Sequence, residues 1–120
     1  MPYGGDFSAR SPGEVVTFTF DLFNDLASGD TIASIVSSSL STFKGVDNYS
    51  SLLLVGSAQI LDGLGPSSAV AQRIGANPNN TVGFRPGVIY EWTVTVLTAE
   101  GDTRQWFCRL PISRGTPVPL

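Results

Sequence analysis

The alternation of large apolar side chains with mostly polar ones between Val88 and Thr98 constrains the fold more than any other feature of this sequence. The apolar set comprises Val88, Tyr90, Trp92, Val94 and Val96. Successive side chains of an extended strand point to opposite faces of a sheet. The segment therefore predicts a β-strand with one face in a core and the other face at the surface.

A second alternation follows a short polar turn and predicts a β-hairpin. Trp106, Cys108 and Leu110 share one face, and Phe107 and Arg109 share the other. A slip of one residue would expose an apolar face, so even-numbered residues must oppose even-numbered ones. We expect an odd loop with Glu100–Asp102 at its tip, where Gly101 or Asp102 takes a positive φ. The expected pairs are Val96 with Trp106, Val94 with Cys108, Trp92 with Leu110, Thr95 with Phe107 and Thr93 with Arg109.

Further strands are expected in the N-terminal two thirds of the chain. Residues 14–20 alternate, and residues 31–43 are rich in β-branched side chains and serine, which favours an extended chain. Shorter strands are expected at 51–55, 58–61 and 68–74, with a loop at 75–80. About seven short strands separated by turns predict an all-β fold, a single antiparallel β-sandwich.

One domain accounts for the whole chain, because 120 residues is a common size for a single core. We place the sandwich at residues 12–113, between an N-terminal arm at 1–11 and a C-terminal tail at 114–120. The expected core consists of Val16, Phe18, Phe20, Tyr90, Trp92, Val94, Val96, Trp106, Cys108 and Leu110.

The residues available for chemistry argue against an enzyme. The sequence contains no histidine, which removes the usual general base, the common nucleophile pairs and most zinc sites. Cys108 is expected inside the core, where a cysteine behaves as a small hydrophobic side chain. The oxygen-rich group Asp21, Asn24, Asp25 and Asp30 could bind Ca²⁺, but these are also ordinary turn residues, and their spacing matches no dense calcium loop. We expect no catalytic residues, no metal and no cofactor.

The charge and hydropathy of the chain limit the classes of partner that it can bind. The net charge is -3 and Lys44 is the one lysine, which argues against nucleic acid as a partner. No stretch approaches the roughly 20 apolar residues of a membrane span, and the first residues lack the pattern of a signal peptide. We therefore expect a protein that contacts neither nucleic acid nor membrane.

The expected outer face of the hairpin is the best candidate for a protein interface. Phe107 lies there between Thr95 and Arg109, and Tyr3 and Phe7 are aromatic residues of the N-terminal arm. An outward aromatic in the middle of a strand suggests a surface that a partner covers. A singly exposed aromatic is also common on proteins that use it for nothing, so both interpretations remain open.

Several short motifs resemble those of a known group of proteins. They are Pro12-Gly13-Glu14, Phe20-Asp21-Leu22, Leu26 to Ile32, Tyr90 to Val94, Gly101 and Pro111-Ile112. Over residues 12 to 112 the chain resembles small virion-associated proteins of tailed bacteriophages. The resemblance implies an immunoglobulin-like β-sandwich on or within the particle, and it implies no catalytic residues. Tyr90, two residues before inward Trp92, occupies the place of a tyrosine corner, with Trp where antibody domains have cysteine.

Three functions from different classes follow. The first is a virion structural protein, assembled in the bacterial cytoplasm, that binds other virion proteins and further copies of itself. It would be a capsid decoration or cement protein, or alternatively a neck, tail or fibre component. The second is a carbohydrate-binding module for host glycans, which needs exposed coplanar aromatics, whereas parity places Trp92 and Trp106 inside. A small enzyme is the weakest of the three.

Overall fold

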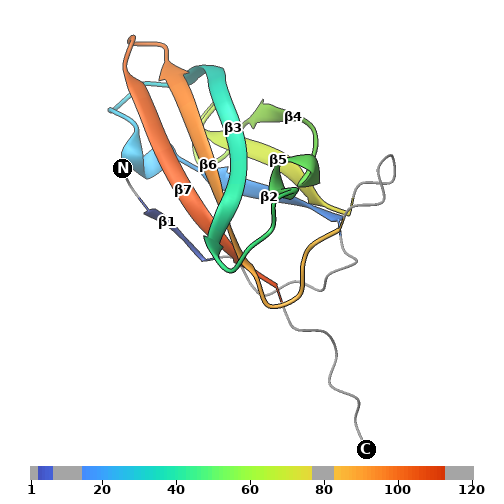
Figure 1. Ribbon diagram of the computed structural model, residues 1–120. Helices are drawn as coiled ribbons and strands as arrows, with labels where there is room; N and C mark the ends of the chain where they lie inside the picture. The colour runs from blue at the N-terminus through green and yellow to red at the C-terminus, as the bar shows by residue number, and fades with distance from the viewer. Residues whose placement is uncertain (1–2, 7–14, 77–82, 113–120) are drawn as a thin grey trace, which may run out of the picture.

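The computed structural model describes residues 3–6, 15–76 and 83–112 and confirms an all-β sandwich (Figure 1). Its strands are β1 (Tyr3–Asp6), β2 (Val15–Asp21), β3 (Ile32–Lys44), β4 (Leu54–Leu61), β5 (Ala69–Gly75), β6 (Ile89–Thr98) and β7 (Thr103–Pro111). Two 3-10 turns, η1 (Phe23–Asp25) and η2 (Ser50–Leu53), lie in the connections.

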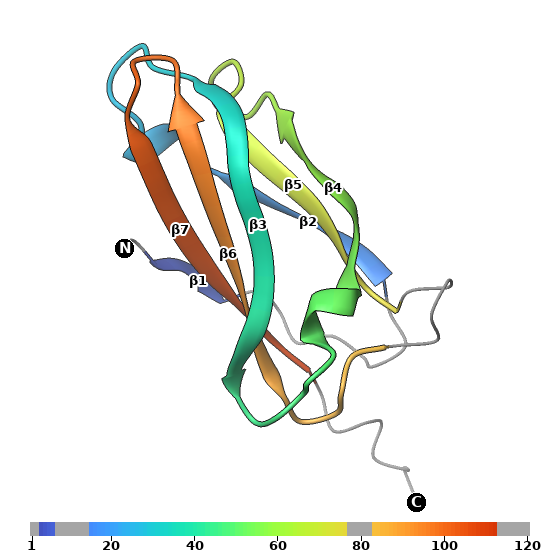
Figure 2. The same cartoon turned by 45° about the horizontal axis from the view of Figure 1, so that its top comes forward.

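The strands form two sheets packed face to face, as Figure 2 shows. One sheet has the order β1-β7-β6-β3 and the other β2-β5-β4. All neighbours are antiparallel except β1, which runs parallel to β7. The order β7-β6-β3 matches strands G, F and C of an immunoglobulin fold, and β2-β5-β4 matches strands B, E and D. The sandwich therefore has immunoglobulin-like connectivity.

Strand β1 extends the first sheet. It lies within the segment 1–11 that was expected to form an arm, yet Tyr3 pairs with Phe107 and Asp6 pairs with Arg109 along β7. This part of the expected arm therefore belongs to the sheet. The rest of the arm, including Phe7, and the tail at 114–120 lie outside the described residues.

The β6–β7 hairpin has the parity that the sequence predicts, but the expected register is wrong by two residues. The inner pairs are Val94 with Trp106, Trp92 with Cys108 and Tyr90 with Leu110. The outer pairs are Thr95 with Gln105, Thr93 with Phe107 and Glu91 with Arg109. Trp92 therefore does not oppose Leu110, and Thr95 does not oppose Phe107.

Hydrogen bonds at the turn explain the shift. The Thr98 N–H donates to the Asp102 carbonyl at 2.8 Å, and the Asp102 N–H donates to the Thr98 hydroxyl at 3.1 Å. These bonds place Ala99–Gly101 at the tip, and Gly101 takes the positive φ of 92° that such a loop needs. The loop has an odd number of residues, as expected, so the same residues face the core. Because the loop is centred one residue earlier in the chain than expected, every residue of β6 opposes a residue of β7 two positions earlier than expected.

The segment expected as a strand at 51–55 is the second correction. Ser50–Leu53 forms the 3-10 turn η2, and β4 begins only at Leu54. The turn places Leu53 in the core, and the Ser50 hydroxyl donates to the Leu40 carbonyl at 3.2 Å. Burial of one leucine through a turn therefore prevails over the β-propensity of the segment. The strand expected at 58–61 lies within β4, and the strand expected at 68–74 corresponds to β5, which begins one residue later, at Ala69.

The core lies between the sheets and is built around two tryptophans. Trp92 and Trp106 are each only 1% exposed, and each buried indole N–H has a partner. Trp92 donates to the Ser38 hydroxyl at 2.8 Å, and Trp106 donates to Asp25 at 3.1 Å. Phe18, Tyr90, Val94, Val96, Cys108 and Leu110 are also buried, whereas Val16 and Phe20 are partly buried against the core. Burial raises the pKa of the Cys108 thiol to about 12, which keeps it neutral.

Candidate functional site

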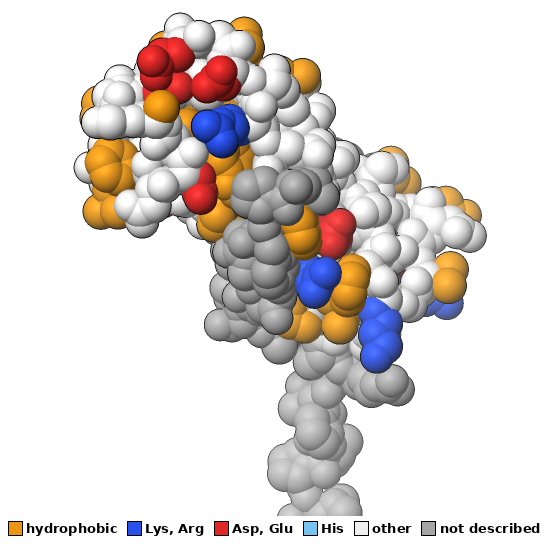
Figure 3. Space-filling view, turned by 90° about the vertical axis from the view of Figure 1, so that its left-hand side faces the viewer, with side chains coloured by type: hydrophobic (Ala, Val, Ile, Leu, Met, Phe, Trp, Pro, Cys, Tyr) orange, Lys and Arg blue, Asp and Glu red, His pale blue; other side chains and the backbone are white. Residues whose placement is uncertain are grey.

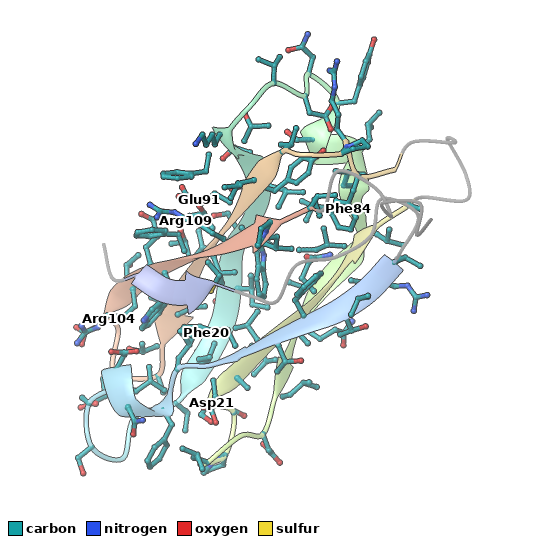
Figure 4. The ribbon with its side chains drawn as sticks, turned by 90° about the horizontal axis from the view of Figure 1, so that it is seen from below. Phe20, Asp21, Phe84, Glu91, Arg104 and Arg109 are labelled. Carbon is teal, nitrogen blue, oxygen red and sulfur yellow. The ribbon has the colours of Figure 1, made fainter. Side chains whose placement is uncertain are left out.

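The outer face of β3, β6 and β7 brings together Phe43, Glu91, Phe107 and Arg109, which we call the outer-face patch. The Arg109 guanidinium carbon lies 3.5 Å from the centre of the Phe43 ring and 5.7 Å from that of Phe107. Its Nε lies 3.6 Å from a carboxylate oxygen of Glu91. Figure 4 shows Glu91 and Arg109 close together on this side of the sheet. One cation is thus held between two aromatic rings and a carboxylate.

Strand pairing positions each member of the patch. Glu91 lies directly opposite Arg109, and Phe107 lies two residues before Arg109 on the same face of β7. Phe43 comes from the far end of β3, where the register with β6 shifts between Thr42 and Lys44. Phe43 is 49% exposed, whereas Phe107 and Arg109 are half-buried. The patch is therefore an ordered surface that still offers apolar area to a partner.

The energetics favour a contact surface. Cation–π contacts at exposed sites contribute about 0.5–1 kcal/mol each, and a partly exposed ion pair contributes about 0–1 kcal/mol. These contacts hold the arginine in one conformation, so a partner that covers it loses little side-chain entropy. Arginine and aromatic side chains are also the residues that dominate protein interfaces. The arrangement is suited to protein recognition.

The other residues expected at the interface, Thr95, Tyr3 and Phe7, are not members of the outer-face patch. Thr95 lies on the same outer face, but its partner is Gln105, whose amide donates to the Thr95 hydroxyl at 2.9 Å. The backbone of Tyr3 runs beside Phe107. Phe7 lies outside the described residues. The structure therefore brings Phe107 and Arg109 together and leaves Thr95 at the margin of the patch.

Sequence reasoning missed Phe43 and Glu91. Glu91 has the parity of the outer face, but the expected register put Thr93 opposite Arg109. Phe43 reaches Arg109 only through the pairing of β3 with β6, which joins residues far apart in the chain. A correct turn assignment would have identified Glu91, whereas nothing local in the sequence identifies Phe43.

Tyr90 forms a tyrosine corner at one end of the core. The Arg85 N–H donates to the Tyr90 hydroxyl at 2.8 Å, and that hydroxyl donates to a carboxylate oxygen of Asp47. The Phe84 ring lies 5.5 Å from the Tyr90 ring, centre to centre. Burial and the adjacent Asp47 raise the pKa of Tyr90 well above its ordinary value. The corner joins the segment before β6 to the loop after β3, and it stabilises the fold.

The expected oxygen-rich group is divided among separate structural roles. Asp21 accepts hydrogen bonds from the Phe23 and Leu64 N–H groups and from the Ser68 hydroxyl, at 2.7–3.1 Å. Burial opposes its ionisation, but these donors lower the pKa of Asp21 below the ordinary value. Asp25 accepts from Trp106. Within the part of the chain that is described, no three His, Cys, Asp or Glu side chains are grouped as metal ligands.

A groove lies at the open edge between β3 and β4 and is lined in part by Val36, Leu54 and Gln72. The Gln72 side chain is buried, accepts from the Ser38 hydroxyl at 3.0 Å and donates to the Gly56 carbonyl at 3.1 Å. It replaces ladder bonds where the pairing of β4 with β5 is interrupted. Two of the polar side chains that line this groove, Ser38 and Gln72, therefore form hydrogen bonds within the fold.

The fold and the patch together define an immunoglobulin-like β-sandwich with a cation–aromatic cluster on the outer face of one sheet. Comparisons with protein-family models, with curated proteins and with solved structures found no match to this chain. None of the helices in the described segments has the length and apolar character to span a membrane.

Proposed function

We propose that this chain is a structural protein of a tailed-bacteriophage particle. In this proposal it is a decoration or cement protein that binds the capsid surface in many copies through the outer-face patch. A neck, tail or fibre position is the alternative within the same class. The resemblance of residues 12–112 to small virion-associated proteins supports the phage assignment, and the outer-face patch supports the mode of action.

The outer-face patch is the observation that carries the proposal. Arg109 is held between Phe43 and Phe107 on the face of the β1-β7-β6-β3 sheet that points away from the core. An isolated exposed aromatic would say little, but two aromatics that flank an ordered arginine resemble an interface hot spot. Such a surface suits a flat contact with a protein shell.

The burial of the tryptophans disfavours the carbohydrate-binding alternative. Sugar platforms need aromatic faces in solvent, and Trp92 and Trp106 both lie inside the sandwich. If the carbohydrate alternative were correct, tryptophan fluorescence would respond to a glycan ligand or to an added quencher. We expect no response to glycans and little quenching.

Mass spectrometry of purified phage particles, with copy counting against the major capsid protein, tests the proposal. Copy numbers in the hundreds support a capsid position, and about six, twelve or a few tens support the neck or tail. Absence from the particle would reject the proposal.

A further inference from the structure

Carboxylates gather at one end of the sandwich, which we call the acidic end. Its members are Asp21, Asp25, Asp30, Asp62, Glu100 and Asp102, which lie in or beside the β2–β3, β4–β5 and β6–β7 connections. Hydrogen bonds join these connections, since the Leu64 N–H donates to Asp21 and the Glu100 N–H donates to Asp30. Arg104 is the one cation near this end among the described residues. Figure 3 shows acidic side chains on the visible face of this end of the molecule.

Asp30 strengthens the field of the acidic end because its charge is held away from solvent. The residue is 7% exposed, and its Oδ1 accepts from the Thr31 and Glu100 N–H groups at 2.8 and 3.1 Å. Its Oδ2 is buried and makes no hydrogen bond of ordinary geometry. A buried charge is screened by salt much less than an exposed one. Beside it, residues 23–24 and 26–30 line a hollow, and Phe23 and Leu26 form the apolar part of its wall.

The opposite half of the molecule carries the cations. Lys44 ends β3, Arg73 lies near the end of β5, and Arg85 precedes β6, and all three side chains are exposed. We call these three residues the basic end. Arg109 lies in the same half, paired with Glu91, and Asp47 is bound to Tyr90. Among the side chains that the structure describes, the net charge is therefore negative at the acidic end and positive at the basic end.

We propose that copies of this chain associate head to tail, the acidic end of one copy receiving the basic end of the next. Opposite potentials on two ends of one molecule are complementary to a second copy in a way that a single charged patch is not. The hollow beside Asp30 suits the stem of a lysine or arginine, whose apolar part would lie on Phe23 and Leu26. A head-to-tail contact closes into a ring or grows into a filament. The inference stands whether or not the protein belongs to a phage particle.

Sedimentation velocity at low and high salt tests the association. At about 20 mM salt the screening length is roughly 20 Å, and at about 500 mM it is roughly 4 Å. At protein concentrations up to about 1 mM, we expect the weight-average mass to rise above 12.7 kDa at low salt and to return to it at high salt. A monomer under both conditions would overturn the proposal.

Charge reversal identifies the surfaces. The double variant Glu100→Lys with Asp102→Lys removes most of the negative charge of the acidic end, and Lys44→Glu with Arg73→Glu reverses the charge of the basic end, all at exposed positions. Each variant alone should stay monomeric at low salt, and mixing the two should restore association. An increase in the weight-average mass of either variant alone would contradict the proposal, and so would a mixture that stays monomeric.

Arg104→Glu is the matched control, because it should strengthen the association that the other two variants weaken. It removes the one described cation of the acidic end, so association at low salt should become tighter by several-fold. Circular dichroism of every variant shows whether the sandwich is intact. An unchanged or weaker association of a folded Arg104→Glu variant would count against the acidic end as the contact surface.

Discussion

The two faces of the β6–β7 ladder carry aromatic side chains at alternate positions, and the structure uses them differently. Trp92 and Trp106 point inward, are fully buried and donate their indole N–H groups to partners inside the fold. Phe107 points outward, where it is half-buried beside Arg109. The inner face determines whether the chain folds, and we propose that the outer face determines what it binds.

Trp92→Ala should have the largest effect on stability. The change removes a fully buried indole and leaves a cavity between the sheets, so we expect a loss of about 3–5 kcal/mol in the free energy of unfolding. Urea denaturation followed by circular dichroism measures it. A loss below about 1 kcal/mol would contradict the role assigned to the inner face, because the ring would then contribute little to the stability of the core.

Tyr90→Phe should have an intermediate effect. It keeps the buried ring but removes the hydroxyl that links the Arg85 N–H to Asp47. We expect a loss of about 1–3 kcal/mol, because the Arg85 N–H loses its acceptor and one carboxylate oxygen of Asp47 loses its donor. Tyr49→Phe, at a side chain that is 64% exposed, is the matched control and should leave the unfolding midpoint unchanged. Equal effects of the two variants would contradict the role assigned to the corner.

Asp21 lies at the end of β2, outside the β6–β7 ladder, and we expect it to contribute to the loss of stability at low pH. Its pKa is lowered in the folded state, so its contribution is present above the pKa of the unfolded chain and is lost as pH falls through the folded value. Urea midpoints between about pH 7 and pH 3 should fall less steeply for Asp21→Asn than for the native chain. Parallel pH profiles would show that these hydrogen bonds do not depend on the charge.

Phe107→Ala should have the smallest effect on the isolated protein. The ring is half-buried on an outer face and leaves no enclosed cavity, so we expect a loss below about 1 kcal/mol. A loss close to that of Trp92→Ala would show that the outer face is part of the core. Arg109→Gln keeps much of the stem but removes the cation–π contacts and the ion pair, so we expect a loss of about 1–2 kcal/mol.

The sequence was sufficient to separate the two faces, because alternation is a local property. Parity alone places Trp92 and Trp106 together and Phe107 with Arg109. The register could not be predicted in the same way, because it depends on whether Thr98 or Ala99 closes the turn. The hydrogen bonds between Thr98 and Asp102 settle this, and they shift Glu91 opposite Arg109.

The rest of the patch could not be predicted from the sequence because it depends on long-range pairing. Phe43 and Arg109 are far apart in the chain, and β3 joins β6 through several register shifts. The turn η2 was missed for a related reason, since Leu53 gains its burial only after both sheets have formed. Local patterns predict which face a side chain takes, whereas the contacts that build a surface form only in the folded molecule.

Incorporation of an outer-face variant into the particle tests the central claim most directly. Particles assembled with the native chain or with the double variant Phe107→Ala and Arg109→Gln would be purified and their copies counted by mass spectrometry. We predict that circular dichroism shows the double variant to be folded, although less stable than the native chain, and that it is strongly depleted from the particle. A folded double variant incorporated at the native copy number would contradict the account.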